Sequence, residues 1–176
     1  MSIESLLEVV PPPQSPFEGF NGPWEPVEAE LRLVLPPDYK DFVRLYGSGY
    51  FMEFLGICVP RTTNPNTRLE AYARVVCEAT YEDDKLDCLL WPRTGGLLPF
   101  GSTDNGDTLF WLTRGQPAEW PVVVWDRGLG DLESFECDLT DFLASLASGG
   151  ILPKEFPETL RYCDHLFQPN QMHGDE

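Results

Sequence analysis

Residues 97–111, LLPFGSTDNGDTLFW, are the stretch that decides how the rest of the chain folds. Apolar residues at its start and its end are typical of β-strands, and a run of turn-forming residues lies between them. Within that run, Asn105 and Gly106 both tolerate a positive φ, which a tight hairpin turn requires. The stretch therefore predicts a hairpin at the middle of a β-sheet, although it points to no particular chemistry.

Hydrophobic spacing on either side of this hairpin predicts further helices and strands. Apolar residues at helical spacing indicate helices at 1–10, 24–35, 38–46 and 64–84, and the apolar run 50–59 indicates one strand. Residues 89–92 fit either a short strand or a packed connection, 122–125 and 132–137 are typical of paired strands, and 139–146 form a helix capped by Asp138. Helices followed by an antiparallel meander and a last helix predict an α+β fold rather than alternating βαβ units.

The length of 176 residues is natural for one domain. We place an N-terminal helix and a proline-rich lead at residues 1–23, the domain itself at 24–149 and a C-terminal extension at 150–176. The polar end of that extension, residues 168–176, is expected to be mobile.

Acidic residues dominate the composition, with 29 Asp and Glu against 12 Lys and Arg and a formal net charge of −17. Binding to nucleic acids and to anionic membranes depends on basic side chains, so we expect neither as a partner. A basic protein is the partner that this charge favours. The alternative is that the acidity only keeps the protein soluble.

Targeting signals and cysteine spacing bear on the compartment. The sequence shows no signal peptide and no apolar run of membrane-spanning length. Its five cysteines are scattered and form no CxxC pair, which is typical of reduced thiols. We therefore expect a cytoplasmic protein, and the sequence leaves its oligomeric state open.

No residue pattern predicts a catalytic set, a metal site or a cofactor. The two histidines, His165 and His173, both lie in the C-terminal extension and lack the paired ligands of a zinc site. Asp104 and Asp107 flank the Asn-Gly turn, where they could form an acid–base pair or bind calcium. We favour the alternative that these side chains stabilise the turn through backbone hydrogen bonds.

Tryptophans and clustered carboxylates indicate a protein-binding surface. Trp91 and Trp120 lie beside prolines near the ends of predicted elements, where a partly exposed Trp rimmed by acidic groups is typical of an interaction hot spot. The alternative is that each Trp covers an edge of the core. The acidic run from Glu82 to Asp84 lies at the negative end of a predicted helix dipole, so it is either solvated or directed at a partner.

Three segments stand out for their residue types, order and spacing. The first contains Leu35, Pro36, Tyr39, Phe42 and Gly47; the second contains Pro99, Phe100, Gly101, Asn105, Gly106, Asp107 and Trp111; the third runs from Trp120 through Phe135 to Phe142 and Leu143. Together these segments resemble the SUKH superfamily, which includes bacterial immunity proteins and fungal cell-wall regulators. The Gly47-Ser48-Gly49 turn departs from the Asn-Gly that the family often shows. The proline-rich lead and the segment after Gly149 have no counterpart.

The resemblance implies a central twisted, mostly antiparallel sheet flanked by helices, and a role without catalysis. Many bacterial members bind and neutralise a cognate toxin, often a nuclease, whereas others, as in fungi, are scaffolds or regulators of signalling and cell-wall synthesis. We predict an immunity protein for a basic toxin, with a scaffold as the alternative and a hydrolase using Asp104 and Asp107 as a third hypothesis. The predicted contact residues are Glu82, Asp83, Asp84, Trp91, Asp104, Asp107, Trp120, Asp126 and Asp131.

Overall fold

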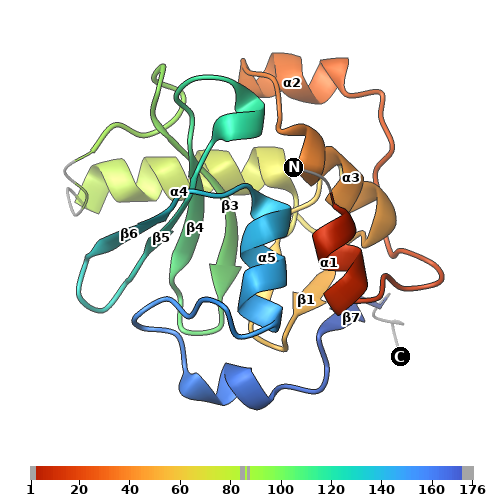
Figure 1. Ribbon diagram of the computed structural model, residues 1–176. Helices are drawn as coiled ribbons and strands as arrows, with labels where there is room; N and C mark the ends of the chain where they lie inside the picture. The colour runs from red at the N-terminus through yellow and green to blue at the C-terminus, as the bar shows by residue number, and fades with distance from the viewer. Residues whose placement is uncertain (1–2, 84–85, 87, 172–176) are drawn as a thin grey trace, which may run out of the picture.

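The computed structural model describes residues 3–83, 86 and 88–171 (Figure 1). Its helices are α1 (Glu4–Val9), α2 (Glu25–Leu31), α3 (Pro37–Leu45), α4 (Leu69–Asp83) and α5 (Leu139–Ala147), and the 3-10 turns are η1 (Pro117–Glu119) and η2 (Glu158–Tyr162). The strands are β1 (Gly49–Phe51), β2 (Leu55–Ile57), β3 (Leu97–Thr103), β4 (Thr108–Leu112), β5 (Val122–Trp125), β6 (Leu132–Phe135) and β7 (Phe167–Pro169).

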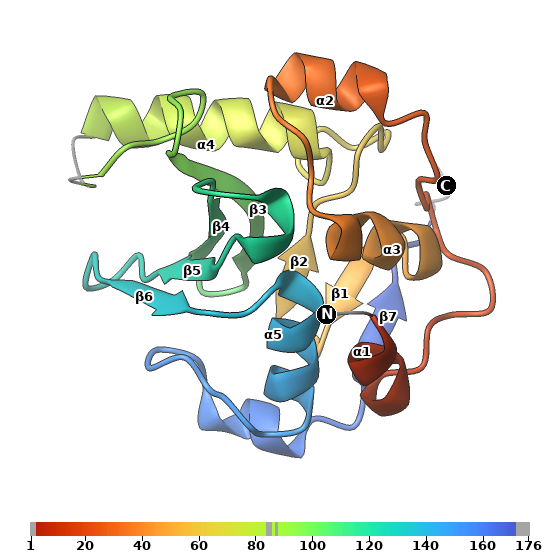
Figure 2. The same ribbon diagram turned by 45° about the horizontal axis from the view of Figure 1, so that its top comes forward.

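These strands form one antiparallel sheet in the order β6-β5-β4-β3-β2-β1-β7. The predicted hairpin is confirmed: β3 and β4 lie at its centre, and Gly106 takes the positive φ of 88° that the turn requires. Helix α4 covers one face of the sheet, whereas α5 covers the other together with α1 and α3 (Figures 1 and 2). The α+β fold with a helix-flanked sheet is therefore confirmed.

The core is centred on Trp111 of β4, which is fully buried on the α5 side of the sheet. Its ring stacks on Phe100 at a centroid distance of 4.2 Å and meets the ring of Tyr39 edge-on at 4.9 Å. The hydroxyl of Tyr39 donates a 2.7 Å hydrogen bond to the carbonyl of Cys58, which ties α3 to the chain after β2. Much of the sequence motif that carried the resemblance is thus used to build the core.

The single strand predicted at 50–59 is wrong, because the chain reverses direction inside it. Met52 and Glu53 have φ values of 53° and 54°, and the amide of Phe54 donates to the carbonyl of Phe51 across this turn. Non-glycine residues rarely adopt such angles, so the sequence contains no turn signal here. Burial of Met52 and a hydrogen bond from its amide to the carbonyl of Leu166 hold the turn in place.

Helix α4 begins at Leu69, five residues after the predicted start at Asn64. The side chain of Asn64 accepts a hydrogen bond from the amide of Asn66 at 2.9 Å, so the segment 64–67 forms a turn of its own. Asn is a good helix cap, but its side chain can equally close an Asx turn, and the sequence did not separate these outcomes.

Segments on both sides of the predicted 24–149 domain pack onto it. Helix α1 packs against α5, and β7 pairs with β1. The expectation of a mobile 168–176 segment is therefore wrong for Gln168 and Pro169, which belong to β7, and residues 172–176 lie outside the described part of the chain. Gly49 makes this pairing possible, because a Cβ atom there would lie 2.5 Å from the carbonyl oxygen of Gln168.

Candidate functional site

Three loops meet at one end of the sheet, and we call residues 52–54, 104–107 and 126–131 the hairpin end (Figure 1). The amide of Asp104 donates to the carbonyl of Phe54 at 3.0 Å, and the amide of Arg127 donates to a carboxylate oxygen of Asp107 at 3.3 Å. These bonds place the loops side by side. The structure therefore brings together the predicted site residues Asp104, Asp107, Asp126 and Asp131.

Asp107 is 3% exposed and serves the turn itself. One of its carboxylate oxygens accepts the hydroxyl of Thr103 at 2.8 Å, and that hydroxyl in turn accepts the amide of Asp107 at 3.1 Å. The other oxygen accepts the amide of Arg127 from the neighbouring loop. Asp107 is thus wrong as a surface contact residue, because its carboxylate holds two turns together, as turn chemistry favours.

Asp126 plays a similar part in the loop between β5 and β6. Its carboxylate accepts the amides of Gly128 at 2.6 Å and Leu129 at 3.0 Å, and the residue is buried. Asp126 is therefore a turn residue rather than a surface contact. Asp104 and Asp131 are exposed, so these two carboxylates of the predicted set face solvent at the hairpin end.

The prediction of partly exposed tryptophans is wrong for both Trp91 and Trp120. Trp91 is 9% exposed and its indole N–H donates a 2.7 Å hydrogen bond to the carbonyl of Leu31, so it anchors α2. Trp120 is 5% exposed and packs beside Trp111 at a centroid distance of 6.4 Å. Both rings fill the edge of the core and leave little surface for a partner.

The described part of the acidic run, at the end of α4, does not join the hairpin end. Glu82 and Asp83 lie in the last turn of α4, and Asp84 lies outside the described residues. This helix packs on β3 and α2, and in both views its last turn lies apart from the hairpin turns (Figures 1 and 2). Contact of this run with a partner stays a separate prediction.

Sequence reasoning missed three acidic residues that extend the hairpin end. Glu53 is exposed at the tip of the unpredicted turn between β1 and β2. Glu133 lies on β6, where its carboxylate accepts the amide of Lys154 at 2.9 Å, and this contact brings the exposed Glu155 alongside. An isolated Glu gives no signal of its own, and only the turn at Met52 and the fold of the extension bring these residues to this end.

Basic side chains pair with carboxylates elsewhere in the fold. In the described part of the chain, the ion pairs lie on α2, α3, α4 and the loop before α4, and they are Lys40–Glu28, Arg44–Asp41, Arg61–Glu30, Arg61–Glu70 and Arg74–Glu30. None of these pairs involves Glu53, Asp104 or Asp131. The hairpin end also carries two exposed basic side chains, Arg127 beside Gly106 and Lys154 beside Glu133. Carboxylates outnumber these two cations there, and those of Glu53, Asp104 and Asp131 have no ion-pair partner among the described residues, so the local potential is negative.

Potential nucleophiles and metal ligands do not converge among the described residues. Burial raises the pKa of the Cys58 thiol strongly and that of Cys77 to about 12, so neither thiol is an activated nucleophile. No cluster of three or more His, Cys, Asp or Glu side chains suited to a metal ion is found in that part of the chain. The hypothetical Asp104–Asp107 catalytic pair is not assembled, since Asp104 faces solvent and Asp107 is engaged in its turn.

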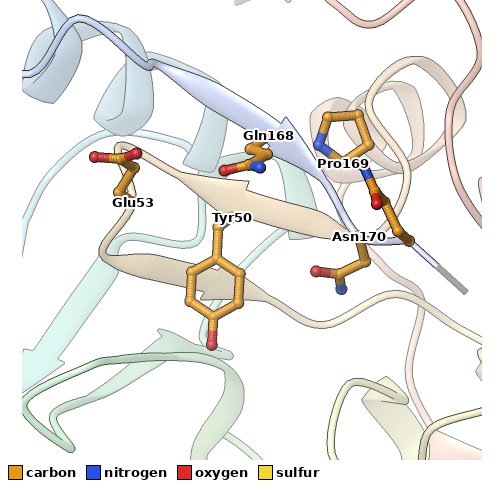
Figure 3. A pocket seen from close by; sticks show the side chains of 6 residues that line it. Tyr50, Glu53, Gln168, Pro169 and Asn170 are labelled. Atoms are coloured by element: carbon orange, nitrogen blue, oxygen red, sulfur yellow. The ribbon is translucent and has the colours of Figure 1, made fainter. Parts of the chain in front are cut away.

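A hollow of about 350 Å³ lies where β7 joins β1 (Figure 3). It is lined by Tyr50, Glu53, Gln168, Pro169, Asn170 and Gln171. Tyr50 and Asn170 project to the same side, and the amide group of Asn170 donates to the hydroxyl of Ser48 at 2.8 Å. Polar groups line the hollow without a nucleophile and base in contact, so its geometry favours no catalytic step.

The fold and the acidic hairpin end together define an α+β protein that offers a charged surface and no assembled catalytic group among its described residues. The sequence model of the family described as SMI1-KNR4 cell-wall (SUKH_6) matches residues 22–143. The chain belongs to this family and hence to the SUKH superfamily. Comparison with curated protein sequences finds no match. Within the described residues, no helix has the length and apolar character needed to cross a membrane.

Proposed function

We propose that this protein is a non-catalytic, cytoplasmic immunity protein that binds and neutralises a basic toxin through its hairpin end. The observation that carries the proposal is the group of exposed carboxylates there that have no ion-pair partner among the described residues, which are Glu53, Asp104, Asp131 and Glu155. Membership of the SMI1-KNR4 family supports a protein-binding role in general.

Charge complementarity explains how such a surface would select its partner. A concentrated negative face attracts a basic protein over several ångströms and raises the association rate, most strongly at low salt. A toxin that acts on nucleic acid holds phosphates with Lys and Arg. Carboxylates presented at the same spacing would occupy those side chains and exclude the substrate.

The test is binding to the products of the reading frames next to this gene. We expect a basic, toxic product to bind wild-type protein and to lose at least about tenfold in association rate when Asp104→Asn, Asp131→Asn and Glu155→Gln are combined. The matched control combines Glu8→Gln, Glu25→Gln and Glu78→Gln, which remove the same charge from exposed positions on α1, α2 and α4. Equal loss in both variants, or no binding to any neighbouring product at low salt, contradicts the proposal.

A regulatory scaffold is the second candidate, and the cell-wall description of the matching family favours it. It uses the same surface, but its partner is not toxic. Expression of the partner alone separates the two functions, since growth arrest that this protein relieves is expected only for a toxin and its immunity protein.

A further inference from the structure

Strand β6 is one edge of the sheet, and it pairs only with β5 among the described residues. Its side chains alternate between exposed and half-buried, and Leu132 is 43% exposed. The strand contains no proline, so each of its residues keeps a backbone N–H group. An edge strand of this kind presents unpaired N–H and C=O groups that another strand can use.

The register shows which groups these are. The amide of Asp126 donates to the carbonyl of Asp131, so these two residues form a hydrogen-bonded pair of the antiparallel ladder. Hydrogen-bonded and non-hydrogen-bonded pairs alternate along such a ladder. Glu133 and Phe135 therefore direct their backbone groups towards β5, whereas Leu132 and Ser134 direct theirs away from the sheet.

The charge of the side chains around β6 indicates which kind of segment could pair with it. A small recess of about 40 Å³ between the β5–β6 hairpin and residues 153–156 is lined by Asp126, Asp131, Glu133 and Glu155, with Lys154 as its only cation. Pairing with a second copy of the chain is disfavoured in the register with Leu132 opposite Ser134, because it places Glu133 directly opposite Glu133. A segment with Lys or Arg side chains would instead be attracted by the carboxylates of the recess.

We propose that β6 receives an added strand from an extended, basic segment of a partner protein. Main-chain bonds to Leu132 and Ser134 supply the docking, and a Lys or Arg of the added strand enters the acidic recess. This inference rests on the proposed binding function and adds the mode of contact to it.

The first experiment uses peptide probes, and so does not depend on finding the natural partner. The basic peptide acetyl-Lys-Val-Arg-Val-Lys-Val-amide is titrated into the wild-type protein, and amide hydrogen exchange is followed by NMR. We expect exchange at Leu132 and Ser134 to slow by about tenfold, as for one new hydrogen bond each. The same peptide with every backbone amide N-methylated, and a Glu-for-Lys/Arg analogue, should leave both amides unchanged.

Three results overturn the proposal. They are unchanged exchange at both amides with the basic peptide at millimolar concentration, equal protection by the N-methylated peptide, and slowing that depends on protein concentration without any peptide. The last result would identify a second copy of the chain as the occupant of the edge.

The second experiment changes the protein. Ser134→Pro removes one outward N–H without removing a bond to β5, and Ser134→Ala keeps that N–H while removing the side chain. With folding verified by circular dichroism, we expect Ser134→Pro to bind the basic peptide, and any neighbouring protein that binds wild type, about tenfold more weakly than Ser134→Ala does. Equal affinity of the two variants rejects the added strand while leaving the proposed function standing. If no neighbouring protein binds the wild-type protein, the proposed immunity function is rejected. The peptide experiment then still tests whether β6 accepts an added strand.

Discussion

β7 and β6 are the two edges of one sheet, and they end it in opposite ways. On β7, the amides of Met52 and Asn170 form ladder bonds between β1 and the ends of β7, which places Gln168 facing β1 and Pro169 facing outwards. Proline has no N–H group to offer at that outward position. On β6, both outward residues keep their N–H groups, and Leu132 borders the acidic recess.

The two edges therefore differ in their outward backbone groups, since β7 has Pro169 there and β6 keeps the N–H groups of Leu132 and Ser134. β7 is held by rings as well as by backbone, since Phe167 meets Tyr46 edge-on at 5.3 Å and Phe42 at 6.5 Å. β6 has one aromatic contact to the helices, between Phe135 and Phe142 at 5.2 Å. Proline and charged side chains both protect edge strands from aggregation. Charged side chains, unlike proline, leave the outward N–H groups able to pair with another strand.

The largest expected effect concerns α5, which supports the β6 side through Phe142. Burial, and secondly the charge of Asp138, raise the pKa of Asp38 to about 6, while Asp38 accepts the amide of Thr140 at 3.1 Å. Because the folded-state pKa exceeds the unfolded one, the folded state takes up a proton first as the pH falls. Ionised Asp38 therefore destabilises the folded state at neutral pH. As the pH falls from 6 to 4, protonation relieves this penalty and the free energy of unfolding rises.

Asp38→Asn should remove this pH-dependent contribution, so the stability difference between this variant and wild type should change by roughly 2.5 kcal/mol between pH 7 and pH 4. Urea denaturation at each pH measures it. A difference between wild type and Asp38→Asn that is constant with pH contradicts the prediction.

The next effect tests how closely β7 is fitted to β1. Gly49→Ala places a Cβ atom 2.5 Å from the carbonyl oxygen of Gln168 and 2.6 Å from the ring of Phe167, so we expect a loss of about 2 kcal/mol in the free energy of unfolding. Gly56→Ala on the neighbouring strand is the matched control, since its Cβ atom would come no nearer than 3.9 Å to Ser102. Equal losses of stability in Gly49→Ala and Gly56→Ala, measured by urea denaturation, would show that β7 does not pack closely against Gly49.

A pair of proline substitutions tests the contrast between the edges directly. Gln168→Pro removes an N–H that faces β1, and we expect it to lower the free energy of unfolding by about 1.5 kcal/mol. Ser134→Pro removes an N–H that faces solvent, and its effect should be clearly smaller. Thermal denaturation ranks the two variants, and the reverse order would mean that the outward residues of one edge are wrongly assigned.

The smallest effect concerns the loop beside β6. Asp126→Ala deletes the acceptor of two backbone amides and should lower stability by about 1 kcal/mol, as for the loss of a helix cap. Asp131→Ala, in the same loop and exposed, should change stability by less than about 0.5 kcal/mol. Similar values for the two variants, measured by urea denaturation, would argue against the turn role of Asp126.

The sequence predicts the backbone conformation where neighbouring residues determine it, and it does not where contacts between distant residues determine it. The β3–β4 hairpin was predictable because Asn105 and Gly106 favour its turn. The β1–β2 turn was not, because Met52 and Glu53 adopt positive φ only under the constraint of the packed core. β7 contains three residues and shows no period, so its strand conformation depends on Gly49, more than a hundred residues away.

The candidate site shows the same division. The turn role of Asp107 follows from its neighbours in sequence, and turn chemistry was the favoured interpretation. The burial of Trp91 depends on an acceptor, Leu31, that is 60 positions distant, so its proximity to a proline was a poor guide to exposure. Glu53 and Glu155 reach the hairpin end only through the fold, and no local pattern distinguishes them from other surface glutamates.

The hydrogen bond from Arg127 to Asp107 has a consequence for recognition. By fastening two neighbouring turns to each other, it fixes the separation of Asp104 and Asp131 before any encounter. Loops already held at their final spacing lose little conformational entropy when they dock. In the proposed binding mode, the buried carboxylate of Asp107 would therefore affect affinity through the spacing of Asp104 and Asp131 and not through a contact of its own.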